Sequence, residues 1–475
     1  PKADACGFGL LPVAVREHEA GDTQAGLDKL AKLSGMAALR LTGQLLCEQT
    51  AFTLRDAPDM LRASGVEALV VDQISPSGGA LADVQKLPFV MACNAMALHQ
   101  EPGVPPGVLN WAYRPGFFGR LRNRIGNTVL KHAAKPIGRT VSAYRVKHGL
   151  EPYHFTDTPN VGLAQIAQQP AFFDFPRLEL PKHFHYTGPW HGHGRDSEKM
   201  SFPWEMLDGR PLIYASLGTL QNRLGGVFRA ILDGCADLPV QVVLSLGRKD
   251  AVWNEPVPAN AIVVPFAPQL SLLERSHLLI THAGLNTALE GLARGLPMLC
   301  MPVTNDQPGV ARRVEWLGAG EVLKPAKATA SRVRQVVQKL LSDGRYRTAA
   351  ERCRDQLKDT PVSFALPTSR RKPSAPASVW NGESSLLRRK RQRLRFLRGV
   401  GEQLLHLGVI AKRGEVGVVD RARAVVPLGR ESPTALHCRP QRLDRVHQVF
   451  RLLLRVLGRS GQQREAAREQ PQVVN

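Results

Sequence analysis

Long apolar runs are absent from this chain of 475 residues. No uninterrupted apolar stretch approaches the roughly 18 residues that a membrane-spanning helix needs. The first residues also lack the basic-then-apolar pattern of a secretory signal. We therefore expect a protein that is soluble or, at most, transiently associated with a membrane surface.

Paired cysteines are lacking as well. The seven cysteines are odd in number, widely scattered and free of any CxxC pair; they stand at positions 6, 47, 93, 235, 300, 353 and 438. This spacing argues against both a disulfide framework and a zinc ribbon. A reducing compartment fits best, so we expect a cytoplasmic location, with the inner membrane as the surface for any peripheral contact.

Acidic residues are scarce in the last part of the chain. Residues 361–475 contain 23 of the 63 Lys and Arg but only 8 of the 41 Asp and Glu, which leaves 40 basic and 33 acidic residues before them. The formal charge of +22 would suggest nucleic acid or anionic lipid as a partner, but most of it lies in this tail. The basic run Arg388–Arg398 lacks any groove-reading motif, so we expect no nucleic-acid partner.

What is present is an alternation of short apolar strands and helices. The expected strands are 68–72, 87–93, 211–216, 240–247, 261–266, 278–281 and 296–303, and the expected helices are 26–61, 227–238, 285–294, 308–317 and 330–342. The pattern predicts an α/β fold of two Rossmann-like domains that face each other across a cleft. We place them at 1–182 and 205–360, joined by a linker at 183–204.

Two further segments break this rhythm. Residues 100–126 are rich in Pro, Gly, Arg and aromatics, which predicts a long loop with short helices over a cleft. Residues 361–475 form a basic tail with no alternation of strands and helices. We interpret this tail as disordered or as the product of an altered reading frame near residue 360.

The stretch from Phe266 to Gln307 carries the most chemical information. A strand ends at Thr281, a tight turn follows at His282 to Gly284, and the next helix presents its free N–H groups and positive dipole end to that turn. This geometry suits a diphosphate. Asp306 and Gln307 follow the next strand, where a carboxylate and an amide suit sugar hydroxyls.

These residues resemble a known signature in order and spacing. The ten matching positions are Phe266, Gln269, His282, Gly284, Asn286, Thr287, Glu290, Pro302, Asp306 and Gln307. They are similar to the UDP-glycosyltransferases, inverting enzymes with the two-domain GT-B fold. The flanks 70–82, 185–192 and 202–222 look like bacterial zeaxanthin glucosyltransferases, and the resemblance runs from about residue 8 to about residue 358.

The resemblance implies that glucose passes from UDP-glucose to the hydroxyls of zeaxanthin, with inversion and with no metal or other cofactor. Residues 1–182 would bind the acceptor and residues 205–360 the nucleotide sugar. Two alternatives stay open, namely transfer to another apolar acceptor such as a macrolide or a hydroxylated lipid, and a catalytically dead nucleotide-sugar-binding protein.

The resemblance also assigns roles within the donor site. Phe266 would stack on uracil, Glu290 would bind ribose, and Asp306 and Gln307 would hold glucose. The diphosphate would contact the loop Ser216, Gly218 and Thr219 together with His282, Gly284, Asn286 and Thr287, and Gln269 completes the signature. The plainer alternatives are core packing for Phe266, an exposed helix position for Glu290, helix capping for Asn286 and Thr287, a capping or core role for His282, and a simple tight turn at Ser216.

Asp72 is the candidate catalytic residue, because it ends a parallel strand where ligands bind. In the family an Asp in this region orients a base His, and that His lies in an opening strand–loop–helix unit. This sequence begins at Pro1 with what looks like the third strand, so we expect that unit to be missing and the polypeptide to turn over negligibly. The alternative is that Asp72 caps the following turn.

Four histidines close together, at 183, 185, 191 and 193, raise the question of a metal site. Two of them are followed by Pro-rich or Gly-rich turns rather than held on one rigid element, and no carboxylate or cysteine partner has metal-ligand spacing. We therefore predict no metal site.

Overall fold

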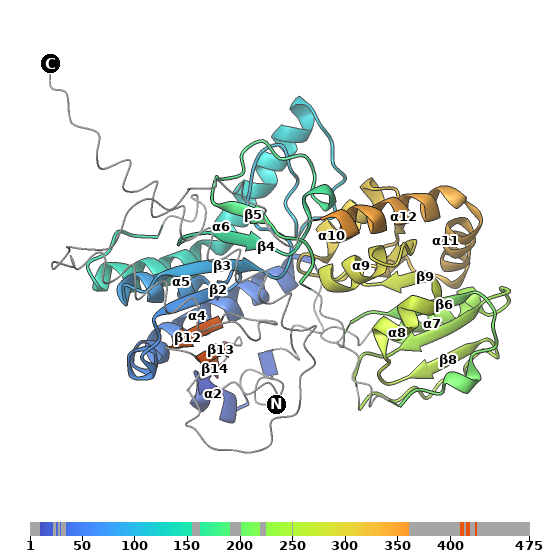
Figure 1. Ribbon diagram of the computed structural model, residues 1–475, viewed down its shortest axis with the longest axis horizontal. Coiled ribbons are helices and arrows are strands. Elements are labelled where there is room, and N and C mark those ends of the chain that lie inside the picture. The colour runs from blue at the N-terminus through green and yellow to red at the C-terminus, as the bar shows by residue number, and fades with distance from the viewer. Residues whose placement is uncertain are drawn as a thin grey trace, which may run out of the picture.

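The structure is a computed structural model that describes residues 10–21, 25–26, 29, 35–153, 162–190, 201–218, 225–248, 250–360, 409–412, 415–418 and 423–424. Two six-stranded sheets organise these residues, one in each of two lobes (Figure 1). The prediction of an α/β fold with two Rossmann-like domains is confirmed.

The first sheet is built from parallel strands that alternate with helices. Its parallel strands, in spatial order, are β2 (Ala68–Asp72), β3 (Phe89–Cys93), β4 (Gln165–Ala167) and β5 (Phe184–Tyr186). The short helix α2 (Val15–Glu19) comes first in the chain, and the longer helices α4 (Gly35–Ser64), α5 (Pro76–Val84) and α6 (Phe117–Lys147) follow it. Leu54, Val71, Leu81 and Val141 join α4, β2, α5 and α6 in one buried apolar cluster.

The second sheet is parallel throughout. Its strands, in spatial order, are β11 (Gly320–Val322), β10 (Met298–Cys300), β9 (Ser276–Thr281), β6 (Leu212–Ser216), β7 (Gln241–Ser245) and β8 (Ala261–Val264). All residues of β6, β7 and β10 are buried, as expected for a sheet that is covered on both faces.

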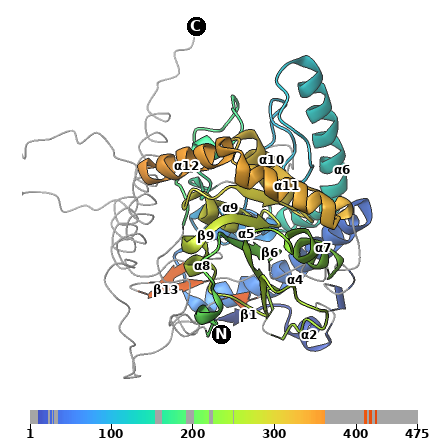
Figure 2. The ribbon, with the colours of Figure 1, turned by 90° about the vertical axis from the view of Figure 1, so that its right-hand side faces the viewer.

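Helices cover both faces of this second sheet. One buried cluster contains α7 (Gly225–Cys235) and α11 (Ala330–Ser342). The other contains α8 (Gln269–Arg275), α9 (Leu285–Leu292), α10 (Gln307–Trp316) and α12 (Gly344–Asp359). Figure 2 shows α11 and α12 running across the lobe.

Two details of the first domain correct the expectations from sequence. Strand β5 lies inside the predicted linker 183–204 and pairs with β4, so this domain extends further along the chain. Its residues, Phe184 to Tyr186, are too few for an alternation to be recognised. Helix α6 begins at Phe117, inside the section expected to be loop and short helices, and runs for 31 residues. The buried residues of this helix include glycines and asparagines in its first half, so no apolar periodicity indicated it from the sequence.

The ends of the described chain also differ from expectation. Strand β12 (Val409–Lys412) pairs antiparallel with β2 and with β13 (Glu415–Val418), so part of the predicted tail 361–475 adds to the first sheet. Backbone pairing at a sheet edge tolerates many sequences, which is why composition did not indicate it. Leu11–Pro12 (β1) pairs with Arg423–Ala424 (β14) in a separate two-stranded sheet, rather than forming a strand of the first large sheet.

Helix α10 of the second domain packs closely against the first domain. A Cβ atom on Gly309 would lie 2.4 Å from the Gly107 carbonyl oxygen, so only glycine permits this approach. Arg312 donates a hydrogen bond to Asn110 across the same contact. Because α10 starts next to Asp306, this packing places the predicted sugar-binding residues against the first domain.

No helix among the described residues is long and apolar enough to cross a membrane. The cysteines within that part of the chain, Cys47, Cys93, Cys235, Cys300 and Cys353, carry free thiols. Burial raises the pKa of the Cys93 and Cys235 thiols to about 12, so these thiols stay protonated at neutral pH.

Candidate functional site

Three neighbouring strands of the second sheet end at the same level. Ser216 of β6 pairs in register with Thr281 of β9, which pairs in turn with Cys300 of β10. The loops that follow these strands therefore lie side by side at one edge of the sheet. They contain Gly218, the turn at His282 and the segment up to Asp306, so the fold brings together the predicted diphosphate and glucose residues. Thr219 lies outside the described residues.

The imidazole of His282 lies between two glycines. A Cβ atom on Gly218 or on Gly284 would each come within 2.7 Å of the ring. Gly218 also has a φ of +82°, a left-handed conformation that side chains disfavour. Ala283, between the His and the second glycine, takes a φ of +62°, which completes the tight turn.

Burial lowers the pKa of His282 to about 4, although a hydrogen bond with the Ser216 main chain opposes the shift. The ring is therefore neutral at pH 7 and can donate one N–H. Its Nδ1 atom is buried and has no hydrogen-bond partner among the described residues, and the same is true of the Asn286 side-chain oxygen. Two polar groups at this turn are thus available to a ligand.

Helix α9 begins directly after the turn. Gly284 occupies its N-cap, and no side chain caps it. The first N–H groups of the helix, together with its dipole, form a general anion-binding arrangement. The capping alternative for Asn286 and Thr287 is therefore wrong for the side chains, although their backbone lies in the first turn.

A polar cluster lies one turn further along α9. The Gln269 Nε2 donates to Glu290 Oε2 over 2.6 Å and to Thr287 Oγ1 over 3.4 Å. The Tyr214 hydroxyl donates to Gln269 Oε1 over 3.4 Å. Glu290 is only 1% exposed, so the alternative of an exposed helix glutamate is wrong. Phe266 is partly exposed, and its stacking on uracil stays a prediction.

Asp306 and Gln307 both make contacts in the described chain. The Met96 N–H donates to Asp306 Oδ2 over 3.0 Å, so this carboxylate reaches the first domain. Gln307 Oε1 accepts from the N–H groups of Val303 (2.9 Å) and Thr304 (3.0 Å). The oxygen of Gln307 thus stabilises its own loop, and its amide N–H groups are the donors that it can present to a sugar.

Asp72 lies at the end of β2 and is buried. Its Oδ1 accepts from the Ile74 N–H over 3.1 Å, and its Oδ2 accepts from Asn94 Nδ2 over 2.9 Å. The turn-capping contact is therefore formed, and the catalytic role stays a prediction. The next residue, Gln73, donates from Nε2 to the Met96 carbonyl over 2.9 Å. Met96 thus connects the end of β2 with Asp306.

A cavity of about 330 Å³ lies in the first domain beside this connection. Gln73 and Met96 line one part of it, and α6 contributes Leu130 and Ile137. The predicted loop over a cleft is borne out in part, because residues Val104 to Val108 also line the cavity. Most of the lining is apolar, so the cavity suits an apolar molecule.

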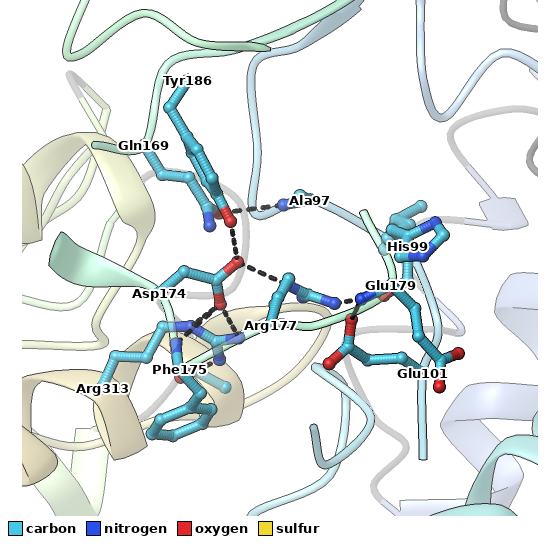
Figure 3. Close-up of polar contacts among 12 residues, drawn as sticks. Ala97, His99, Glu101, Gln169, Asp174, Phe175, Arg177, Glu179, Tyr186 and Arg313 are labelled. Atoms are coloured by element: carbon cyan, nitrogen blue, oxygen red, sulfur yellow. Dashed lines mark hydrogen bonds and ion pairs between the residues drawn. The ribbon is translucent and has the colours of Figure 1, made fainter. Parts of the chain in front are cut away.

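A buried ionic cluster lies between the two domains, around Arg313 of α10 (Figure 3). Asp174 Oδ1 accepts from Arg313 Nη2 (2.6 Å) and Nε (3.0 Å). Its Oδ2 accepts from Arg177 Nε (2.6 Å) and from the Tyr186 hydroxyl (2.8 Å). The side chains of Asp174 and Arg313 are each 1% exposed. Sequence reasoning missed this cluster, since no local pattern marks a pair 139 residues apart.

The cluster holds charges that burial alone would disfavour. Burial raises the pKa of Asp174, but the guanidinium groups of Arg313 and Arg177 outweigh this and hold it well below the usual range. Burial also lowers the pKa of Arg313, and Asp174 opposes that shift. Both arginines line the cavity, so the cluster supports its wall as well as the interface.

The segments considered for metal or nucleic acid lie only partly within the described residues. His183 and His185 lie at β5, whereas His191, His193 and the basic run 388–398 lie outside the described residues. Within the described part of the chain, no group of three or more His, Cys, Asp or Glu is arranged to hold a metal ion.

Substituting Gly218 by alanine is expected to weaken UDP binding about tenfold, because the new Cβ displaces the His282 ring. The φ of +82° adds a strain of roughly 1–2 kcal/mol to folding. Gly209→Ala is a matched control, since Gly209 has a φ of +83° but nothing within 4 Å of its Cβ position. Calorimetric titration with UDP should separate the two variants, and equal affinities would contradict the role of the ring.

Comparisons with known proteins agree with this geometry. The sequence model of the family described as UDP-glucoronosyl and UDP-glucosyl transferase matches residues 29–365. The zeaxanthin glucosyltransferase of Pantoea ananas is 31% identical over 317 residues, which is 66% of this chain and 73% of that protein. The zeaxanthin glucosyltransferase of Pseudescherichia vulneris is 30% identical over 355 residues, or 74% and 82%.

A solved structure shows the same fold. The crystal structure of the glycotransferase of kitacinnamycin superimposes with a TM-score of 0.55 at 21% identity, covering 70% of this chain and 81% of that one. The GT-B fold expected from the sequence is therefore confirmed.

Proposed function

Because the chain belongs to the UDP-glucoronosyl and UDP-glucosyl transferase family, we propose that it transfers glucose from UDP-glucose to the hydroxyls of zeaxanthin, with inversion. The chain is a glycosyltransferase of this family. The choice of glucose and of zeaxanthin is the proposal. The two relatives named above support it, since both are named for that acceptor.

The observation that carries the proposal is the link between the apolar cavity and the donor loops. Met96 lines the cavity, and its N–H bonds Asp306 at the edge of the second sheet. An apolar acceptor in the cavity would therefore end close to a sugar held at Asp306 and Gln307. A cavity of about 330 Å³ holds only part of a long carotenoid, so the rest of the acceptor would extend outside it.

In the proposed reaction the acceptor oxygen attacks the anomeric carbon, and the bond from that carbon to the diphosphate oxygen breaks. Negative charge develops on the leaving diphosphate. The free N–H groups of α9 are positioned to stabilise it, so the proposal needs no metal or other cofactor. Asp72 has its proposed role on the acceptor side of the reaction. It would stabilise the cation that forms when a base takes the acceptor proton.

The decisive experiment incubates the full protein with UDP-glucose and zeaxanthin in detergent and separates the products by chromatography. Glucosides of zeaxanthin are the result that the proposed function predicts, and they would show that the negligible turnover expected from the sequence is wrong. Transfer of glucose only to a macrolide or a hydroxylated lipid would confirm the glucosyl transfer but would show that zeaxanthin is not the acceptor. Binding of UDP without transfer to any of these acceptors would indicate a nucleotide-sugar-binding protein instead.

A further inference from the structure

The N-terminal half of α6 exposes large apolar side chains to solvent. Phe117 is 72% exposed and Phe118 83%, and their rings contact each other edge to face. Leu121, Ile125 and Val129 are also exposed, and with Phe118 they follow the three- and four-residue spacing of one helical face. Single exposed apolar residues are ordinary, but a continuous stripe with two aromatics marks an interaction surface.

Basic residues are interspersed with this stripe along the sequence. From residue 102 to residue 150 the sequence contains no Asp or Glu, but it contains nine Lys and Arg. Arg114, Arg120 and Arg124 are exposed, and each lies within three residues of a stripe residue in the sequence. Arg122, by contrast, turns inward to the Trp111 ring and the Ala112 carbonyl. The exposed charge is thus of one sign, which complements a negatively charged surface.

The position of the stripe suits a flat partner. The cyan end of α6 projects beyond the neighbouring helices in both views (Figures 1 and 2). An amphipathic helix with aromatic and aliphatic side chains on one face and arginines beside them is typical of segments that lie in a membrane interface. Each arginine near an anionic bilayer contributes about 1 kcal/mol.

The other face of the same helix lines the apolar cavity. Asn127, Leu130, Ala134 and Ile137 of α6 border it, whereas neither Phe117 nor Phe118 does. Helix α6 therefore presents the exposed stripe on one face and lines the candidate acceptor cavity with the other face.

We propose that the N-terminal half of α6 docks the protein on an anionic lipid bilayer. The apolar stripe enters the headgroup region, and Arg114, Arg120 and Arg124 contact the lipid phosphates. A corollary, which rests on the proposed function, is that an apolar acceptor dissolved in the bilayer passes along α6 into the cavity.

The test is sedimentation of the full protein with vesicles. One set contains phosphatidylcholine with roughly one third phosphatidylglycerol, and the other contains phosphatidylcholine alone. We expect strong binding to the anionic vesicles and weak binding to the neutral ones. The double variant Phe117→Ser/Phe118→Ser and the double variant Arg120→Gln/Arg124→Gln should each bind the anionic vesicles about tenfold more weakly.

Matched controls are Val252→Ser, at an apolar side chain that is 77% exposed in the second domain, and Arg345→Gln, at an arginine that is 88% exposed. Both should bind vesicles like the unaltered protein. All variants should keep their UDP affinity, which shows that they are folded. Vesicle binding that the double variants retain would overturn the proposal and point to another basic segment. A change of oligomeric state in the double variants, with vesicle binding unaltered, would overturn it in favour of a subunit interface.

The corollary has its own readout. The Phe117→Ser/Phe118→Ser variant should lose about tenfold in glucosylation of zeaxanthin held in anionic vesicles, but not in detergent micelles. Equal rates from vesicles would contradict loading from the bilayer. Vesicle binding without any transfer by the unaltered protein would overturn the proposed function and leave the docking surface standing.

Discussion

Replacing Asp174 by alanine is expected to lower the free energy of unfolding by about 3–5 kcal/mol. The variant leaves the guanidinium groups of Arg313 and Arg177 buried without their carboxylate, and a buried unpaired charge is costly. The measurement is urea denaturation followed by tryptophan fluorescence, to which Trp316 contributes from its contact with Phe175.

A matched control is Asp233→Ala. Asp233 pairs with Arg229 on the surface, where the two side chains are 41% and 29% exposed, so its loss should cost no more than about 1 kcal/mol. Similar destabilisation by the two variants would show that the buried cluster adds nothing beyond an ordinary surface pair.

The same carboxylate makes stability depend on pH. Its pKa is depressed in the folded protein, so its stabilising effect is complete above the ordinary Asp value of about 3.9 and is lost as the pH falls below that value. Urea midpoints should therefore fall more steeply for the unaltered protein than for Asp174→Asn between about pH 4 and pH 2. Parallel slopes would contradict the depressed pKa.

Replacing Asp306 by alanine is expected to reduce glucose transfer roughly ten- to hundredfold and to leave UDP affinity nearly unchanged. Loss of hydrogen bonds to the sugar alone costs about 1–3 kcal/mol. Asp306 follows β10, whereas the Gln269, Thr287 and Glu290 cluster assigned to the nucleotide lies at α8 and α9. Transfer assays and calorimetric titration with UDP are the two measurements.

Asp306 also accepts the Met96 N–H, so its loss could act through the domain contact instead. Asp306→Asn keeps an oxygen that can accept from Met96 and removes only the charge. If the sugar requires the carboxylate, both variants lose transfer, whereas a domain-contact effect would be rescued by asparagine. An equal loss of UDP affinity in the alanine variant would contradict the assignment to glucose.

Local sequence patterns determined the donor half of this protein. The strand ending at Thr281, the turn at His282 and the helix from Leu285 follow one another within a few residues, so apolar periodicity and turn chemistry suffice to predict them. The parallel sheet then brings the ends of β6, β9 and β10 to one edge. The pattern could not predict that Glu290 is buried against Gln269, because burial depends on α8 packing beside α9.

Tertiary structure alone decided how the two domains meet. Asp174 and Arg313 are 139 residues apart, and Met96 and Asp306 are 210 apart, so no periodic pattern connects them. The cavity likewise combines α4, α6 and the loop after β3, and its shape follows from packing. The sequence by itself determined the chemistry available for a nucleotide sugar, because those groups lie on neighbouring turns of one βαβ unit. The position of these groups relative to an acceptor depends on how α10 docks on the first domain, because only packing brings residues from distant parts of the chain into contact.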